Sequence, residues 1–170
     1  MSLVSFLLSP AGRVRRRDYW LYALAVTALS AILQFAGHQM ITGHPASEFF
    51  TDLGRLSGEA WPPLKIYIWA LSVVFLWPGL CISVKRWHDR NRPAWIAIAI
   101  YVSNLVWSLS APYVGPTTAH PNLWVYYGGL IILVVAVIWQ FVECGCLDGT
   151  KGPNPYGPSP KGIGSQADAF

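Results

Sequence analysis

Four apolar runs dominate the chain, at residues 19–41, 66–84, 94–110 and 123–142. None of them contains Asp, Glu, Lys or Arg, and over most of their lengths none shows the polar stripe that helices of a soluble bundle turn toward water. Each run is near the roughly 20 residues that an α-helix needs to cross a ~30 Å hydrocarbon core. The pattern predicts an all-α, polytopic membrane protein with four transmembrane helices.

Composition favours the same class. Hydrophobic residues make up 54% of the 170 residues and charged residues 12%, whereas a soluble domain averages about 25% charged residues. The opening stretch MSLVSFLLSP is not expected to be a cleaved signal peptide, because its apolar residues precede an arginine cluster instead of following one. We expect residues 3–8 to lie along the membrane interface.

Lysine and arginine are distributed unevenly among the segments between the runs. A basic arm at residues 1–18 holds four of them, the segment between the second and third runs holds four, and a Gly/Pro-rich tail at residues 143–170 holds two. The opposite side of a four-span topology holds only Arg55 and Lys65. Because the excess of Lys and Arg lies in cytoplasmic loops, both termini are predicted to be cytoplasmic, flanking a transmembrane domain at residues 19–142.

Aromatic residues at the predicted cytoplasmic ends agree with this orientation, since Trp and Tyr prefer the headgroup level. The belt expected there comprises Tyr19, Trp20, Trp87, Trp95 and Trp139.

The segment KRWHDRNRPAW, residues 85–95, carries more chemistry than a topology signal requires. Asp89 lies among Arg86, Arg90 and Arg92, so we expect it to pair with at least one arginine. Any spacer with four lysines would satisfy the positive-inside rule. The sequence therefore predicts a more specific role for these residues.

The tail sequence GTKGPNPYGPSPKG, residues 149–162, contains an unexpected aromatic residue. Tyr156 lies among glycines and prolines, and an aromatic side chain in such a segment usually docks on a neighbouring surface. We predict that Tyr156 packs near Trp87 or His88 and that Arg13 or Arg16 of the arm lies close to Asp89. The arm, the central segment and the tail would then form one cap.

Three motifs in order, GRVRRRDYW (12–20), KRWHDRNRPAW (85–95) and GTKGPNPYGPSP (149–160), resemble those of a bacterial inner-membrane family called domain of unknown function 805. The resemblance covers nearly the whole chain and implies a small four-helix protein of the bacterial inner membrane, without implying a reaction. Two departures, Trp87 for the usual leucine and Pro93-Ala94 for Ser-Gly, imply a stiffer central loop. The residues expected to build the cap, or to contact lipid or a partner, are Arg13, Arg16, Tyr19, Trp20, Arg86, His88, Asp89, Arg92, Trp95, Asn154 and Tyr156.

Catalytic chemistry finds little support in the sequence. The His88-Asp89 pair lacks the further His and Asp ligands that a metal phosphohydrolase needs. Cys144 and Cys146 are two residues apart and with His88 would supply three zinc ligands, whereas structural zinc takes four. We expect no catalytic residue, no metal and no cofactor.

Two other function classes remain open. A structural or regulatory membrane protein would use its basic cap to contact anionic lipid or a partner protein, since each cation near a charged leaflet contributes up to ~1 kcal/mol. The alternative is an accessory subunit of a channel or transporter, or an oligomeric channel, although the runs contain no charged residue at depth. Nucleic acid is not an expected partner because topology already explains the basic residues. A homo-oligomer is compatible with either class.

Overall fold

The computed structural model of the chain describes residues 3–51, 62–116 and 121–162. The chain forms two compact units. The first unit comprises Met1–Trp20 and Leu80–Phe170, and the second comprises Leu21–Gly79. Each unit is described by itself below.

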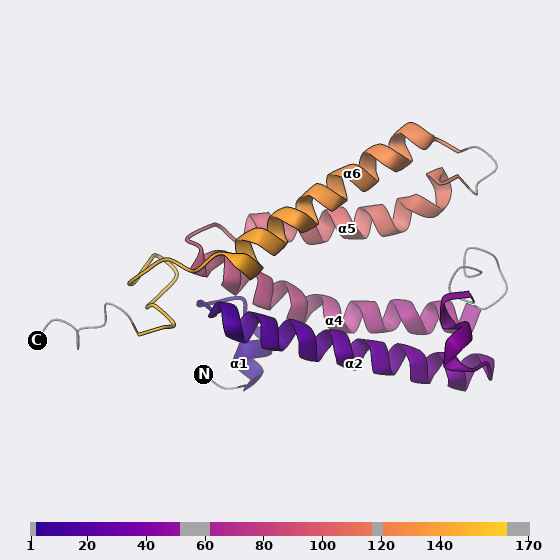
Figure 1. Ribbon diagram of the computed structural model, residues 1–170, viewed down its shortest axis with the longest axis horizontal. Coiled ribbons are helices and arrows are strands. Elements are labelled where there is room, and N and C mark those ends of the chain that lie inside the picture. Colours follow the sequence, from indigo (N-terminus) through magenta and orange to yellow (C-terminus); the bar gives the residue numbers. More distant parts are fainter. Residues whose placement is uncertain (1–2, 52–61, 117–120, 163–170) are drawn as a thin grey trace, which may run out of the picture. The chain divides into compact units, whose positions relative to one another are not determined.

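The described residues form helices and connecting turns, without a β-strand (Figure 1). This confirms the predicted all-α class for the described ranges. The elements are the short helix α1 (Leu3–Leu8), the long helices α2 (Arg16–Thr42), α4 (Pro62–Asp89), α5 (Trp95–Val114) and α6 (Leu123–Gln140), a 3₁₀ turn η1 (Ala46–Glu48) and a π-helical turn η2 (Phe141–Cys146) that continues α6.

Three helical stretches within the described residues are long and apolar enough to cross a membrane: Arg16–Thr42, Pro63–Asp89 and Leu123–Cys146. The apolar part of α5, Trp95–Ala111, is shorter and coincides with the third run of the sequence. The helices thus lie where the four charge-free runs predicted them, with three of them of full membrane-spanning length.

The end of α4 differs from the prediction. The apolar run stops at Val84, but the helix continues to Asp89, so Lys85, Arg86 and His88 belong to its last turns and not to a loop. The helix closes when the Arg92 backbone N–H bonds the Trp87 carbonyl (2.9 Å) and Asn91 takes a left-handed φ of 57°. Backbone hydrogen bonds of this kind at the end of a helix satisfy carbonyls that would otherwise be unpaired.

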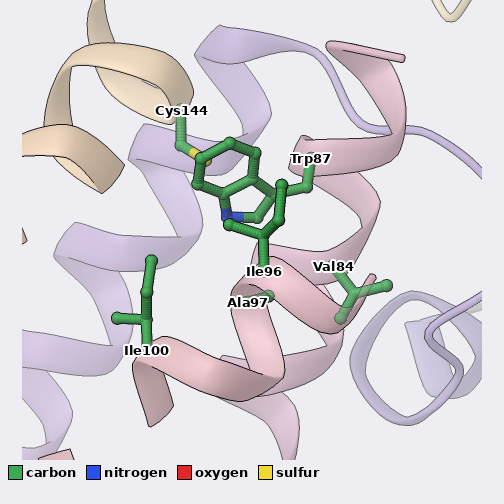
Figure 2. Close-up of a cluster of buried hydrophobic side chains, with 6 residues drawn as sticks. All are labelled: Val84, Trp87, Ile96, Ala97, Ile100 and Cys144. Atoms are coloured by element: carbon green, nitrogen blue, oxygen red, sulfur yellow. The ribbon is translucent and has the colours of Figure 1, made fainter. Parts of the chain in front are cut away.

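The core of the first unit surrounds Trp87, which is fully buried. The other members of this cluster are Val84, Ile96, Ala97, Ile100 and Cys144 (Figure 2). In Figure 2 the Cys144 side chain points toward the Trp87 indole, and Trp139 meets the same indole edge-on at 5.1 Å. The predicted interfacial position of Trp87 is therefore wrong, because this side chain fills the space between α4, α5 and η2.

Helices α5 and α6 pack against each other in the first unit through an aromatic seam (Figure 1). The Trp107 ring of α5 lies 5.1 Å from the Tyr126 ring of α6 and covers Gly129, where an added Cβ would come within 2.5 Å of the indole. The absence of a side chain at Gly129 thus allows the two helices to approach closely.

In the second unit α2 and α4 run side by side (Figure 1). The Tyr67 hydroxyl donates to the Leu33 carbonyl at 2.7 Å, and the Tyr67 ring occupies the space left by Gly37. Small residues that permit close helix contact are typical of membrane proteins. At the far end of α2, His38 is fully buried and contacts the Phe49 ring at 5.4 Å.

Candidate functional site

The arm (residues 12–20), the end of α4 with the following turn (85–92) and the tail (149–158) form a single cluster, which we call the cap. Its centre is Asp89. One carboxylate oxygen, Oδ1, accepts from Arg13 Nε at 3.0 Å and lies 2.9 Å from Arg13 Nη2, and Oδ2 accepts from Arg86 Nη1. The side chains of Arg13, Asp89 and Arg86 are 1%, 4% and 0% exposed. Charges at this depth cost several kcal/mol each unless they are paired, so the three side chains depend on one another.

Arg13 also connects the arm to the tail. Its Nη1 donates to the carbonyls of Gly152 (2.8 Å) and Gly157 (3.2 Å), and its Nη2 donates to the carbonyl of Thr150 (2.7 Å). Gly12, at φ 91°, gives the chain the turn that directs Arg13 inward. A planar guanidinium with five N–H donors suits this role, because it can bond a carboxylate and several carbonyls at once.

Arg86 connects α4 to the end of the last helix. Its Nε donates to the Cys144 carbonyl at 2.7 Å, and its Nη2 donates to the Leu147 carbonyl. The neighbouring Arg90 donates from Nε to Glu143 Oε2 at 3.0 Å. A cation at a helix C-terminus is favourable because unpaired carbonyls there carry partial negative charge. Arg86 thus offsets its own burial by capping η2.

The tail docks on His88. The Tyr156 ring stacks on the His88 imidazole with centroids 3.9 Å apart and planes within 6°. Asn154 Nδ2 donates to the His88 carbonyl at 2.9 Å, and Asn154 Oδ1 accepts from the Tyr156 backbone N–H at 2.9 Å. At the edge of the imidazole, Nδ1 lies 3.3 Å from the Gly12 carbonyl oxygen. Of the two seats predicted for Tyr156, His88 is the one observed, and Trp87 is enclosed in the core.

Two glycines allow the tail and η2 to approach their neighbours. A Cβ at Gly149 would overlap the Asp89 carboxylate, and a Cβ at Gly145 would lie 2.8 Å from the Trp20 indole. Trp20 Nε1 donates to the Gly145 carbonyl at 3.0 Å, and Arg16 Nη1 donates to the Cys146 carbonyl at 2.6 Å. The start of α2 is thereby fixed to the end of η2.

Two predicted residues lie outside this network. The Arg92 side chain is exposed, and the Arg92 backbone N–H donates to the Trp87 carbonyl. Trp95 is 64% exposed at the start of α5, as an interfacial tryptophan would be. The remaining predicted residues converge on the cap or its underlying core: Arg13, Arg16, Tyr19, Trp20, Arg86, His88, Asp89, Asn154 and Tyr156.

Sequence reasoning missed Thr150 and Lys85. The Thr150 backbone N–H donates to the Asp89 carbonyl at 2.8 Å, and its hydroxyl accepts from Asn154 Nδ2 at 3.0 Å. Thr150 follows a glycine, and nothing in this local sequence indicates that it would bond Asp89 and Asn154. Lys85 belongs to the central segment whose cations are expected to contact anionic lipid, yet it is fully buried and donates to backbone carbonyls of α1.

The outer edge of the cap is more exposed. Asp148, with its side chain 58% exposed, lies 3.3 Å from Lys161 Nζ and 3.7 Å from Arg16 Nη2. The hydrogen bond from Lys161, together with the positive charge of Arg16, lowers the pKa of Asp148 below its usual value. Within the described ranges, no three His, Cys, Asp or Glu side chains converge in a way that could hold a metal ion.

Comparison with known proteins covers almost the whole chain. The family described as "Protein of unknown function (DUF805)" matches residues 7–158, a range that includes all three segments of the cap. The chain belongs to the DUF805 family. Membership agrees with the resemblance that the three motifs suggested.

Curated relatives of this DUF805 protein come from Escherichia coli. The uncharacterized protein YiiR of strain K12 is 28% identical over 169 residues, which cover 99% of this chain and 97% of YiiR. The inner membrane proteins YhaI and YhaH of strain K12 are 27% and 26% identical, covering 95% and 88% of this chain and 93% and 85% of their own lengths. No solved structure matches the chain at a significant level.

Proposed function

We propose that this protein is a structural or regulatory component of the bacterial inner membrane, in which four helices span the bilayer and the cap lies on the cytoplasmic side. Two relatives are named inner membrane proteins. The orientation is supported by ten Lys and Arg residues in the arm, central segment and tail, against Arg55 and Lys65 elsewhere. The apolar faces of α6, whose side chains are mostly exposed, would then contact lipid.

The proposal rests on a difference among the cations of the cap: some are buried and others are exposed. Arg13, Lys85 and Arg86 are buried and bonded inside the protein, so they fold the cap. Arg17, with its side chain 76% exposed, and Arg92 remain at the surface. Cations at the edge of a membrane domain attract anionic headgroups, each by up to ~1 kcal/mol. We infer that the cap presents its exposed cations to the anionic lipids of the cytoplasmic leaflet.

Orientation is tested by labelling single cysteines in a background without the three native ones. Glu48→Cys and Lys151→Cys lie at exposed positions at opposite ends of the predicted topology. A membrane-impermeant maleimide added to intact cells should label position 48 and leave position 151 unlabelled until the membrane is opened. Labelling of position 151 on intact cells would contradict the proposed orientation.

Lipid contact is tested by neutralising the exposed cations. The double variant Arg17→Gln/Arg92→Gln should retain less phosphatidylglycerol in native mass spectrometry than the parent does, with phosphatidylcholine retention unchanged. The control is Lys65→Gln, which removes an exposed cation from the start of α4 and should leave retention unaltered. Equal phosphatidylglycerol retention by the double variant and the parent would refute the lipid role of the cap.

A further inference from the structure

Lys85 has an unusual position for a lysine. It lies directly after the apolar run that ends at Val84, and its side chain is fully buried. Its Nζ donates to the carbonyls of Ser5 and Phe6, both at 2.8 Å, and lies 5.3 Å from the centre of the Phe6 ring. A buried ammonium is costly unless it is hydrogen-bonded, and α1 supplies both the acceptors and an aromatic face.

The same contacts matter for α1. The helix spans six residues, Leu3–Leu8, which is too short to be stable by itself in water. Ser5 and Phe6 are among its last four residues, whose carbonyls face the end of the helix, and the Ser5 carbonyl also accepts from the Ser9 backbone N–H at 3.4 Å. Lys85 bonds two of these carbonyls at the negative end of the helix. Lys85 therefore attaches the end of α1 to α4 through two hydrogen bonds.

The outward side of α1 is apolar. Val4 is 67% exposed and Leu8 is 50% exposed, and a separation of four residues places them on the same side of the helix. The helix contains no charged residue, and four arginines follow it between residues 13 and 17. An apolar helix too short to span a bilayer, followed within ten residues by the exposed cation Arg17, has the pattern of an element that lies in the interface plane.

We propose that α1 is an in-plane interfacial helix, with Val4 at the boundary between acyl chains and headgroups, and that Lys85 attaches it to the membrane domain. The bilayer surface, and not a second copy of the chain, is its partner. Lys85 lies where α4 leaves its apolar run, so the carbonyls of α1 that it bonds lie close to the level at which α4 would leave the hydrocarbon core. This inference rests on the proposed membrane embedding, but not on the orientation of the termini or on lipid selectivity.

Spin labels test the location. Val4→Cys is labelled in a background without native cysteines and reconstituted into nanodiscs of phosphatidylethanolamine and phosphatidylglycerol. We expect the label to collide more with oxygen, which concentrates in lipid, than with a water-soluble nickel chelate. Val135→Cys, on the exposed side of α6, reports embedding, and Ala11→Cys, exposed between α1 and the arginines, should favour the nickel chelate.

The outcomes separate this inference from the proposed function. If position 4 favours nickel while position 135 favours oxygen, α1 is not interfacial, although the protein is embedded. If both positions favour nickel, the proposed membrane function fails as well. If position 4 is shielded from both reagents, with spin–spin broadening that disappears on dilution with unlabelled protein, a second copy covers α1 and the lipid assignment is wrong.

The attachment is tested with the same label. Lys85→Met should raise both the mobility and the nickel accessibility of position 4 severalfold, whereas Lys85→Arg should preserve the parent spectrum and Lys65→Met should leave it unaltered. If Lys85→Met fails to fold, Lys85→Gln, which keeps a single N–H₂ donor group, provides the same measurement. A position 4 spectrum identical to the parent in the neutral variant would show that Lys85 does not hold α1.

Discussion

Replacing Asp89 with Asn tests the centre of the cap with almost no change of shape. The substitution removes the negative charge between the two buried guanidinium groups of Arg13 and Arg86 and replaces one acceptor oxygen with an N–H₂ donor. Breaking a buried ion pair by removing one partner costs about 3 to 5 kcal/mol, because the remaining charge stays buried without compensation. At 1.4 kcal/mol per factor of ten, opening of the cap should become more than about a hundredfold more frequent.

Hydrogen–deuterium exchange at Thr150 measures this opening, since its backbone N–H donates to the Asp89 carbonyl at 2.8 Å. In Asp89→Asn, this amide should exchange faster by the factor given above, while amides in the middle of α6 should be unaffected. The matched control is Asp148→Asn, the same chemical change at a carboxylate that is 58% exposed, for which we expect little effect on exchange because water screens its charge pairs. Equal exchange rates at Thr150 in Asp89→Asn and Asp148→Asn would refute the claim that the buried cluster holds the cap.

Three further predictions concern the tail and its edge. Tyr156→Ala should remove a ring stack worth about 0.5 to 1.5 kcal/mol and raise proteolysis of residues 150–160, whereas Lys161→Ala should have little effect; equal cleavage of parent and Tyr156→Ala would contradict the docking. Gly149→Ala should destabilise the cap because its methyl group overlaps the buried carboxylate, whereas Gly128→Ala in α6, where a Cβ has open space, should be neutral or stabilising in thermal unfolding. The pKa of Asp148 is lowered in the folded state, so its contribution to stability is present above the unfolded-state pKa and is lost as the pH falls through the folded-state pKa. NMR titration should give a midpoint below the ordinary value of an aspartate, and the midpoint should rise in Lys161→Ala. An unchanged midpoint would refute the pairing.

The positions of the long helices could be predicted from the sequence because the hydrocarbon core sets their minimum length and excludes charge. Their ends could not. Helix α4 continues past Val84 through Lys85, Arg86 and Asp89, since each of these charged side chains finds partners on segments distant in sequence. A hydropathy pattern stops at the first charge, whereas the helix stops where its backbone turns at Asn91.

In the cap, the contacts that join two side chains were the ones that the sequence could predict. The Arg13–Asp89 pair and the Tyr156–His88 stack follow from complementary residue types in motifs that lie on the same side of the predicted topology. The bonds from Arg86 and Lys85 to main-chain carbonyls were not predictable, because every residue has a carbonyl and the sequence does not mark which one is used. The interpretation of Trp87 as interfacial was wrong because its burial depends on how α5 and η2 pack against α4.

The central claim, that arm, central segment and tail fold into one cap, is tested most directly by magic-angle-spinning NMR of the full chain in lipid bilayers. The account predicts cross-peaks between the rings of Tyr156 and His88, whose centroids are 3.9 Å apart, and between the Arg13 guanidinium and the Asp89 carboxylate. Tyr156 resonances at random-coil shifts, with neither cross-peak present, would contradict it.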